Sequence, residues 1–308
     1  MASELCQTLQ QAVSRHCVDK VTKTALESVT LYRAESPTDP VLVVYEPRFY
    51  VVVQGQKTLL LNEQPFTYGE GEYLISGLEL PVSGRITRAS SQKPYLALCL
   101  SFSPAEIDTV LQKSVGFVHK PMHSRPAMGV SETSAVVMEA LVRLMALLDD
   151  DEPSPFLAEL IKMELLYRLL QEEQGPILYG MAREQSDVAR ITKALDHLKE
   201  HFRKPCEIGA LVAQAGMGHS QFYKQFKMLT GMTPVQYRTR LRLQEARRLM
   251  VWEGSKAADA AFAVGYESPS HFSRDYRKIF GRPPHADLAF IRSIGVERYS
   301  ALHEEVWR

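Results

Sequence analysis

The sequence predicts an α+β protein: a β-barrel with flanking helices, followed by an all-α region that carries two helix-turn-helix motifs. Two observations lead to this fold class. Short apolar segments separated by turn residues occupy residues 28–103, and an internal repeat occupies residues 186–290. The length of 308 residues and the hydrophobic content of 45% suit a globular chain of two domains.

The N-terminal part begins with a segment, residues 1–27, that we expect to be helical, and continues into a β-domain at residues 28–103. The expected strands are rich in Val, Leu, Tyr and Phe, and Gly, Asn and Pro separate them at the spacing of a sandwich or barrel. Several are apolar on both faces, which is typical of strands that face a core or pocket on one side and a neighbouring element on the other. The strands are expected at 41–45, 49–53, 58–61, 73–75 and 95–100.

Residues 104–174 favour helices. Ser103-Pro104 is typical of a helix start, and Ser131 is a candidate cap for a later helix. Two apolar stripes have helical spacing, and we expect them to form intradomain core; the alternative is a dimer seam on an exposed helix at 137–148. The stripes are Val137, Leu141, Leu144, Met145 and Leu148, then Leu157, Leu160, Ile161, Leu165, Tyr167 and Leu169.

Charge distinguishes the two ends of the chain. Residues 186–290 carry 17 Lys and Arg against 10 Asp and Glu, whereas residues 1–185 carry 16 against 23. An acidic front and a basic back indicate that only the back meets a polyanion. Residues 175–185, which contain Gly and Pro, are expected to form a linker, and residues 291–308 a C-terminal tail.

The internal repeat has a period of fifty residues. Apolar, basic and turn positions recur in the same order, which predicts two copies of one supersecondary unit. The matched pairs are Ser220 with Ser270, Phe222 with Phe272, Lys224 with Arg274, Phe226 with Tyr276, Lys227 with Arg277, Gly231 with Gly281 and Pro234 with Pro284.

Each copy has the anatomy of a helix-turn-helix motif. In the first, a helix at 207–215 precedes a glycine-containing turn and a second helix at 219–230. In the second, a helix at 257–264 precedes a second helix that starts near Pro269 and ends at Gly281. Further helices are expected at 187–202 and 235–251.

Polar and basic residues remain on both second helices once their apolar faces are buried. Such a helix suits the major groove, where Arg and Lys pair with guanine edges and Gln, Ser and His address adenine or phosphate. A solvated basic surface is the alternative, but surface charge requires no repeat. DNA contacts are expected from His219, Ser220, Gln221, Tyr223, Lys224 and Lys227 in the first copy and from Ser268, Ser270, His271, Ser273, Arg274 and Arg277 in the second.

Three segments carry a more specific pattern: RLQEARRL at 242–249, AVGYESPSHFSR at 263–274 and FGRPP at 280–284. With them, residues 186–290 resemble the DNA-binding domain of the AraC/XylS family of bacterial transcription regulators. One departure is the run His285-Ala286-Asp287, where the family usually has an aromatic residue followed by Arg. The resemblance implies sequence-specific binding of double-stranded DNA, with contacts by position from Ser220, Tyr223, Lys224, Ser270, Ser273 and Arg274.

The β-domain has its own resemblance. The run GQKTLLLNE at 55–63, followed by YGEGEYLI at 68–75, is similar to the central hairpin of cupin-like jelly rolls. VVYEP at 43–47 and PYLAL at 94–98 resemble the effector-binding arm of one AraC subgroup. The resemblance implies a small-molecule effector in the barrel and a homodimer formed through neighbouring helices. It also implies contact with RNA polymerase if the protein is an activator.

The chemistry expected of the barrel is binding without a metal. Residues 28–103 contain no His, so the usual ligands of a metal-dependent cupin enzyme are missing, and we expect no cofactor. A small effector, apolar or aromatic, is therefore expected, and a fully packed barrel that serves as a dimer scaffold is the alternative. The hydroxyls that could orient such a ligand belong to Tyr45, Tyr50, Tyr68 and Tyr73.

Other function classes find little support. No phosphate-binding loop or nucleophile motif indicates an enzyme, and a purely architectural DNA binder would need no separate β-domain. His119 and His123 flank Pro121 and are expected to be a chance surface pair. No secretory signal or membrane span is predicted, so a cytoplasmic protein is expected. The scattered cysteines, expected to be inert thiols, are Cys6, Cys17, Cys99 and Cys206.

Overall fold

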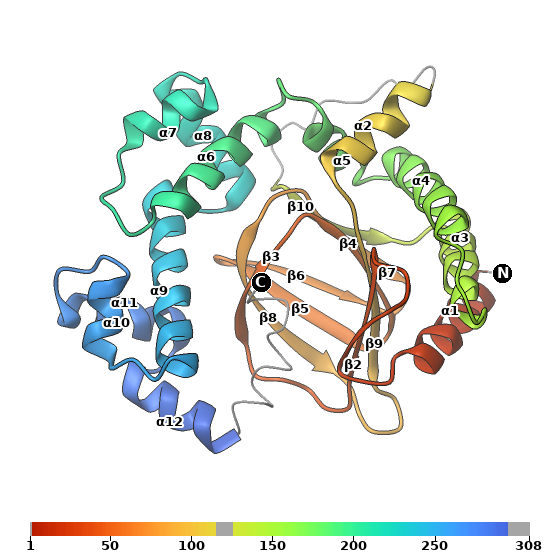
Figure 1. Cartoon of the computed structure of the whole chain (residues 1–308), viewed down its shortest axis with the longest axis horizontal. Helices are drawn as coiled ribbons and strands as arrows, with labels where there is room; N and C mark the ends of the chain where they lie inside the picture. Colours follow the sequence, from red (N-terminus) through yellow and green to blue (C-terminus); the bar gives the residue numbers. More distant parts are fainter. Residues whose placement is uncertain (1, 115–125, 295–308) are drawn as a thin grey trace. The chain divides into compact units, whose positions relative to one another are not determined.

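The computed structural model describes residues 2–114 and 126–294. The chain divides into two compact units: the first takes in the residues before Arg190 except Leu42–Val44, and the second takes in Leu42–Val44 and the residues from Arg190 onward. The N-terminal unit combines a β-domain with helices, and the C-terminal unit is helical (Figure 1). The predicted α+β class is therefore confirmed. The predicted pair of His119 and His123 lies outside the described residues.

Two antiparallel sheets form the β-domain. One has the strand order β1-β2-β9-β4-β7-β10 and the other β3-β8-β5-β6. The central strands β4 and β9 are buried along most of their length, and the helix α1 packs on both, which explains why they are apolar on both faces. The strands are β1 (Val21–Lys23), β2 (Val29–Ala34), β3 (Val41–Tyr45), β4 (Arg48–Gln54), β5 (Gln56–Leu61), β6 (Gln64–Gly69), β7 (Glu72–Ser76), β8 (Leu80–Arg88), β9 (Tyr95–Ser101) and β10 (Met128–Glu132).

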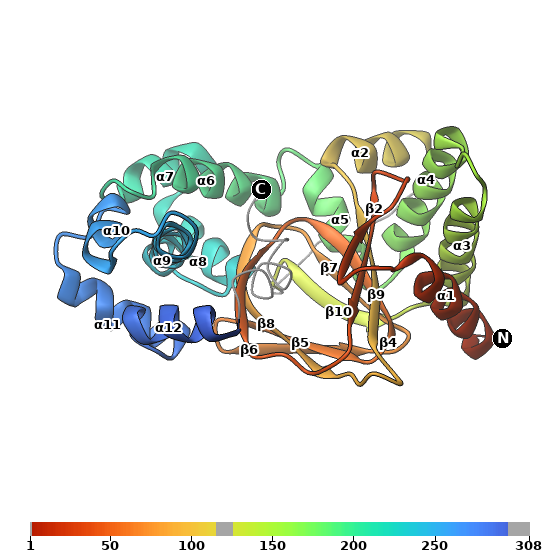
Figure 2. The ribbon, with the colours of Figure 1, turned by 60° about the horizontal axis from the view of Figure 1, so that its bottom comes forward.

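Helices α1, α3 and α4 lie side by side along the β-domain (Figures 1 and 2). The expectation that the stripe on α3 is core is met, since its main apolar residues are buried, and the alternative of an exposed seam at 137–148 is wrong. The stripe on α4 is divided, because Leu165 and Leu169 are buried whereas Leu157, Leu160 and Tyr167 are exposed. The helices of this unit are α1 (Ala2–His16), α2 (Pro104–Lys113), α3 (Ala135–Ala146), the 3-10 turn η1 (Leu147–Asp149), α4 (Pro155–Gln171) and α5 (Gly175–Ala182).

Three local expectations are corrected. The segment 104–174 is not wholly helical, because β10 pairs with β7; Ser131 lies in that strand, and the residue at the N-cap of α3 is Ser134. The expected linker at 175–185 is mostly helix α5, whose apolar face is buried. Gly175-Pro176 does not break the helical structure, because Pro is well suited to the first turn of a helix. The segment 1–27 also contains β1.

The C-terminal unit follows the predicted order of helices closely. The long helix α9 joins the two helix-turn-helix motifs, as expected. The last helix, α12, extends beyond the predicted domain end at residue 290. The helices are α6 (Asp187–His201), α7 (Ile208–Ala215), α8 (His219–Thr230), α9 (Pro234–Trp252), α10 (Ala257–Ala263), α11 (Pro269–Phe280) and α12 (Pro284–Ile294).

Candidate DNA-binding surface and cavities

The first helix-turn-helix motif consists of α7 and α8. Gly216 ends α7 with left-handed backbone (φ 59°), and Gly231 ends α8 in the same way (φ 68°), a conformation that strains other residues. Phe222 and Phe226 of α8 are fully buried. The ring of Phe226 meets Tyr237 of α9 edge-on, with 6.0 Å between ring centroids. This buried stripe determines which face of α8 points outward.

The second motif consists of α10 and α11 and has a better-capped second helix. The Oγ of Ser268 accepts a hydrogen bond from the backbone N–H of His271 at 3.5 Å, and Pro269 occupies the first turn. Phe272 and Tyr276 are fully buried. As in α8, the aromatic stripe of α11 therefore leaves the polar face outward.

A buried arginine holds the turn of the second motif. Arg242 of α9 donates hydrogen bonds to the carbonyl oxygens of Gly265 (2.8 Å), Phe202 (2.6 Å) and Arg203 (2.8 Å), and burial lowers the pKa of its guanidinium. Gly265 has a φ of +89°, and a Cβ there would lie 2.0 Å from the Arg203 carbonyl oxygen. The turn therefore requires glycine.

The residues predicted to meet DNA lie on the outward faces of the two second helices. Every one of them is exposed except Ser273, which is half-buried. In the part of the chain that the structure describes, neither Lys224 nor Lys227 of α8, nor Arg274 nor Arg277 of α11, has an ion-pair partner. Their charges are therefore available to phosphates or base edges.

Two of these residues have an additional role inside the protein. The hydroxyl of Ser268 caps α11, as described above. The Nε2 of His271 lies 3.3 Å from the Asp275 carboxylate, which also accepts a hydrogen bond from the Tyr266 hydroxyl at 3.2 Å. Burial and, next, the Asp275 charge raise the pKa of Tyr266. Sequence reasoning missed Asp275, although its i, i+4 spacing from His271 could have indicated the pair.

The N-terminal unit contains a cavity between the edge strands of the two sheets. Its volume is ≈350 Å³, and it lies between β6 and β10. Pro65, Phe66, Met128 and Val130 provide much of its apolar wall. The amide of Gln174 is its most deeply buried polar group and donates to the Val130 carbonyl at 3.2 Å. The four tyrosines named above are all buried.

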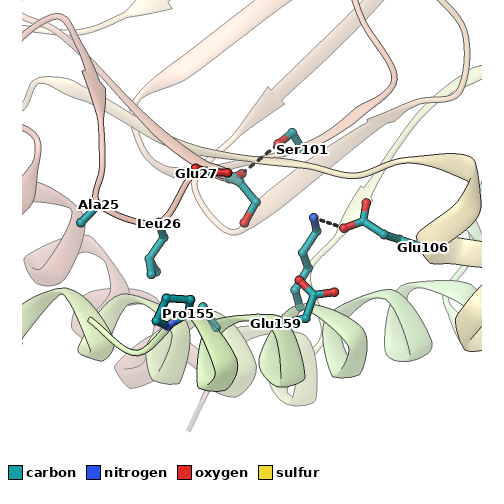
Figure 3. Close-up of a pocket in the computed structure, with 10 residues that line it drawn as sticks. Ala25, Leu26, Glu27, Ser101, Glu106, Pro155 and Glu159 are labelled. Atoms are coloured by element: carbon teal, nitrogen blue, oxygen red, sulfur yellow. Dashed lines mark hydrogen bonds and ion pairs between the residues drawn. The ribbon is translucent and has the colours of Figure 1, made fainter. Parts of the chain in front are cut away.

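A second, charged cleft of ≈540 Å³ lies where the β1–β2 turn and the end of β9 meet α2 and α4 (Figure 3). Lys162 of α4, which is 8% exposed, forms an ion pair with Glu106 of α2. Burial opposes ionisation of Glu106, but hydrogen bonds from Lys162 and Ser103 lower its pKa. The carboxylates of Glu27 and Glu159 complete the lining. This cleft is lined by charged side chains, whereas the residues that line the cavity at β6 and β10 carry none.

The described residues contain no cluster of three or more His, Cys, Asp or Glu that could hold a metal ion. All four cysteines are free, and burial raises the pKa of Cys6, Cys17 and Cys206, which disfavours reactive thiolates. Across residues 2–114 and 126–294, no helix has the length and apolarity that crossing a membrane requires.

The fold and the duplicated motif define a two-domain transcription regulator with a helix-turn-helix DNA-binding domain. Residues 25–177 match the model of the AraC-type transcriptional regulator N-terminus, and residues 211–289 match a helix-turn-helix domain. The chain belongs to the AraC/XylS family, which consists of transcription regulators rather than enzymes.

Similar proteins share this organisation. The HTH-type transcriptional activator RhaS of Shigella dysenteriae is 28% identical over 249 residues, which are 76% of this chain and 82% of RhaS. RhaS of Escherichia coli strain SE11 is 29% identical over 136 residues, so this chain spans about half the length of that relative (47%) and 44% of its own length is matched. Among solved structures, ToxT from Vibrio cholerae has a TM-score of 0.55 at 11% identity over 84% of this chain and 97% of ToxT. That likeness shows a common fold.

Proposed function

We propose that the protein binds specific DNA sequences with α8 and α11 in successive major grooves. The observation that carries this proposal is the duplicated motif, in which each second helix buries an aromatic stripe and exposes hydroxyl, amide and cationic groups. Arg274 and Lys224 hold equivalent positions in the repeat, and both are exposed. Each is suited to a guanine edge or a phosphate.

The test replaces Lys224 or Arg274 with Ala in the full chain. If either side chain reads a base edge, affinity for the operator falls by ~1–3 kcal/mol with relaxed specificity at one position. A phosphate contact would instead weaken all sequences alike and flatten the salt dependence. Lys113→Ala, an exposed cation on α2, is the matched control. Operator affinity within about twofold of wild type for both variants would show that the recognition helices are wrongly assigned.

We also propose that the cavity between β6 and β10 binds a small apolar or aromatic effector. Its lining residues carry no charge and include Phe66, Met128 and Val130, its volume of ≈350 Å³ lies within the range of ligand pockets, and Gln174 provides one oriented amide. A ToxT structure is described as bound to unsaturated fatty acid, which supports an apolar ligand. The charged cleft beside Lys162 suits such a ligand less well.

Thermal-shift screening of aldehydes, aromatic acids and fatty acids tests the effector proposal. A ligand of the cavity should stabilise the wild-type chain, and Val130→Trp should abolish the shift by filling the cavity. Ala158→Trp, which narrows the charged cleft instead, should leave it unchanged. If Ala158→Trp abolishes the shift and Val130→Trp does not, the effector binds in the charged cleft. If no compound stabilises the protein, the alternative of a packed barrel that serves as a dimer scaffold is favoured.

A homodimer is the assembly that we propose. The exposed face of α4 carries Phe156 (71% exposed), Leu157 (46%) and Leu160 (48%), and a two-fold contact would bury the same apolar face on both copies. Analytical ultracentrifugation should find a dimer at micromolar concentration and a monomer for Phe156→Glu/Leu160→Glu. Exposed Val18→Glu serves as the control. A wild-type monomer would refute the dimer.

We further propose that the protein activates transcription, because RhaS is named an activator. RNA polymerase would then be a partner. Since its proposed target is chromosomal DNA, we propose a cytoplasmic location. Transcription in vitro from the selected operator, with and without the protein, separates activation from repression.

A further inference from the structure

One carboxylate joins three helices of the C-terminal unit. Asp287 of α12 is 2% exposed. The guanidinium of Arg247 on α9 donates to both of its oxygens, from Nε at 2.8 Å and from Nη2 at 2.9 Å. The hydroxyl of Tyr276 on α11 donates to Oδ2 at 2.7 Å.

A buried ion pair of this kind is weak evidence for a net gain in folding stability. Removing two charges from water costs several kcal/mol, and apolar residues of similar volume are often equally stabilising or better. The hydrogen bonds have strict distances and directions, however, and apolar contacts do not. A buried bidentate ion pair between Arg247 and Asp287 therefore restricts the relative position of α9 and α12 more tightly than apolar packing would.

That geometry bears on the face of α11 that is proposed to read DNA. Tyr276 belongs to the buried stripe, and Arg274 projects roughly 160° away around a helix of about 3.6 residues per turn. Rotation of α11 by about 20° would move atoms ~6 Å from its axis by ~2 Å. Such a shift exceeds the tolerance of a hydrogen bond to a base edge.

We infer that Asp287, through Arg247 and Tyr276, fixes the rotation and axial position of α11 and so positions its contacts with the stretch of operator DNA that α11 reads, the α11 box. This inference rests on the proposed DNA binding by α11. Asp287 is a positioning residue, since its carboxylate is buried and faces the protein interior.

The first motif provides an internal control. In the described residues, no side chain of α8 takes part in an ion pair, and its packing on α9 includes the contact of Phe226 with Tyr237. A change in the network should therefore affect the box that α11 reads and leave the box that α8 reads unaffected.

The test uses the full chain and a two-box operator selected from random DNA by the wild-type protein. The box read by α11 is the one whose base preference changes in Arg274→Ala. The double variant Arg247→Met/Asp287→Leu replaces the ion pair with apolar side chains. Its thermal midpoint should fall modestly, because the buried Tyr276 hydroxyl loses its acceptor, while its affinity for the operator, measured well below that midpoint, falls at least tenfold. A DNA fragment that contains only the box read by α8 should bind the wild-type protein and the double variant with equal affinity.

Two further variants keep the test decisive. Tyr276→Phe removes one hydroxyl and retains the ring, so it should fold and lose affinity for the α11 box about threefold. Arg248→Met, which breaks a half-buried pair with Glu245 on the same helix, should change neither box. If the double variant binds the two-box operator as tightly as wild type does, the inference is wrong. If the double variant is unfolded, the same outcome for Tyr276→Phe would overturn it. If Arg274→Ala changes neither the affinity for the operator nor the base preference, the DNA-binding assignment itself is wrong.

Discussion

The two helix-turn-helix motifs share one order of residues but are held in place differently. The second helix of the first motif, α8, begins at Gly218 without a side-chain cap. The second helix of the other motif, α11, is capped by Ser268 and joined through Tyr276 to a buried ion pair. The two copies therefore share exposed serine and basic positions, whereas their internal supports differ.

The largest expected effect comes from separating the two motifs on DNA. Because α9 joins them within one compact unit, their boxes should lie about 10 bp apart, one turn of B-DNA. Inserting five base pairs between the boxes should turn one of them to the opposite face and reduce affinity at least a hundredfold. Quantitative footprinting is the measurement; a ten-base-pair insertion, which restores the face but moves one box ~34 Å along the DNA axis, should also weaken binding, because α9 joins the two motifs. Undiminished binding after five base pairs would mean that one motif reads DNA alone.

Glycines in the two turns provide a sharper contrast. Gly216 has φ +59° and open space around the position of a Cβ, so Gly216→Ala should cost only the left-handed backbone penalty, ~1–2 kcal/mol. Gly265 has φ +89°, and its Cβ would meet the Arg203 carbonyl oxygen at 2.0 Å. Gly265→Ala should therefore lower the free energy of unfolding by more than Gly216→Ala does, above ~2 kcal/mol, because the clash adds to the backbone penalty. Urea unfolding of both variants measures the difference, and equal costs would show that the Arg203 carbonyl oxygen does not restrict the residue at position 265.

Local signals explain why the C-terminal unit could be predicted well. Its helices are periodic, and glycines end α8 and α11 with positive φ values. The paired motif could therefore be located to within a residue or two at most boundaries. The exposed faces followed from the buried ones, because the aromatic stripe leaves the other side of each helix to solvent.

The misses depended on partners far away in sequence. The strand β10 exists because it pairs with β7, about fifty residues earlier, from Met128 opposite Ser76 to Glu132 opposite Glu72. The helix α5 is ordered by the burial of Ile177 and Leu178. No local periodicity encodes such contacts.

The ion pair between Arg247 and Asp287 was missed for the same reason. The two residues are forty positions apart. The sequence itself shows only an Asp within the segment of the last helix. Only the fold identifies Arg247 and Tyr276 as its partners.

The smallest expected effect concerns the N-cap of α11. Its hydrogen bond, from the His271 N–H to the Ser268 Oγ, is long at 3.5 Å, so Ser268→Ala should cost about 0.5 kcal/mol, the low end for caps. Ser268→Gly should cost a few tenths of a kcal/mol, and Gly218→Ser should stabilise α8 by a similar amount.

Hydrogen exchange at the first-turn amides of the two helices is a suitable measurement, because it reports each helix end separately from DNA contacts. Faster exchange in α11 of Ser268→Ala, together with slower exchange in α8 of Gly218→Ser, would attribute the difference between the two helix starts to the capping hydroxyl. If Gly218→Ser leaves α8 unchanged while Ser268→Ala loosens α11, the contrast instead reflects the whole turn around Gly265, in which Arg242 is the dominant support.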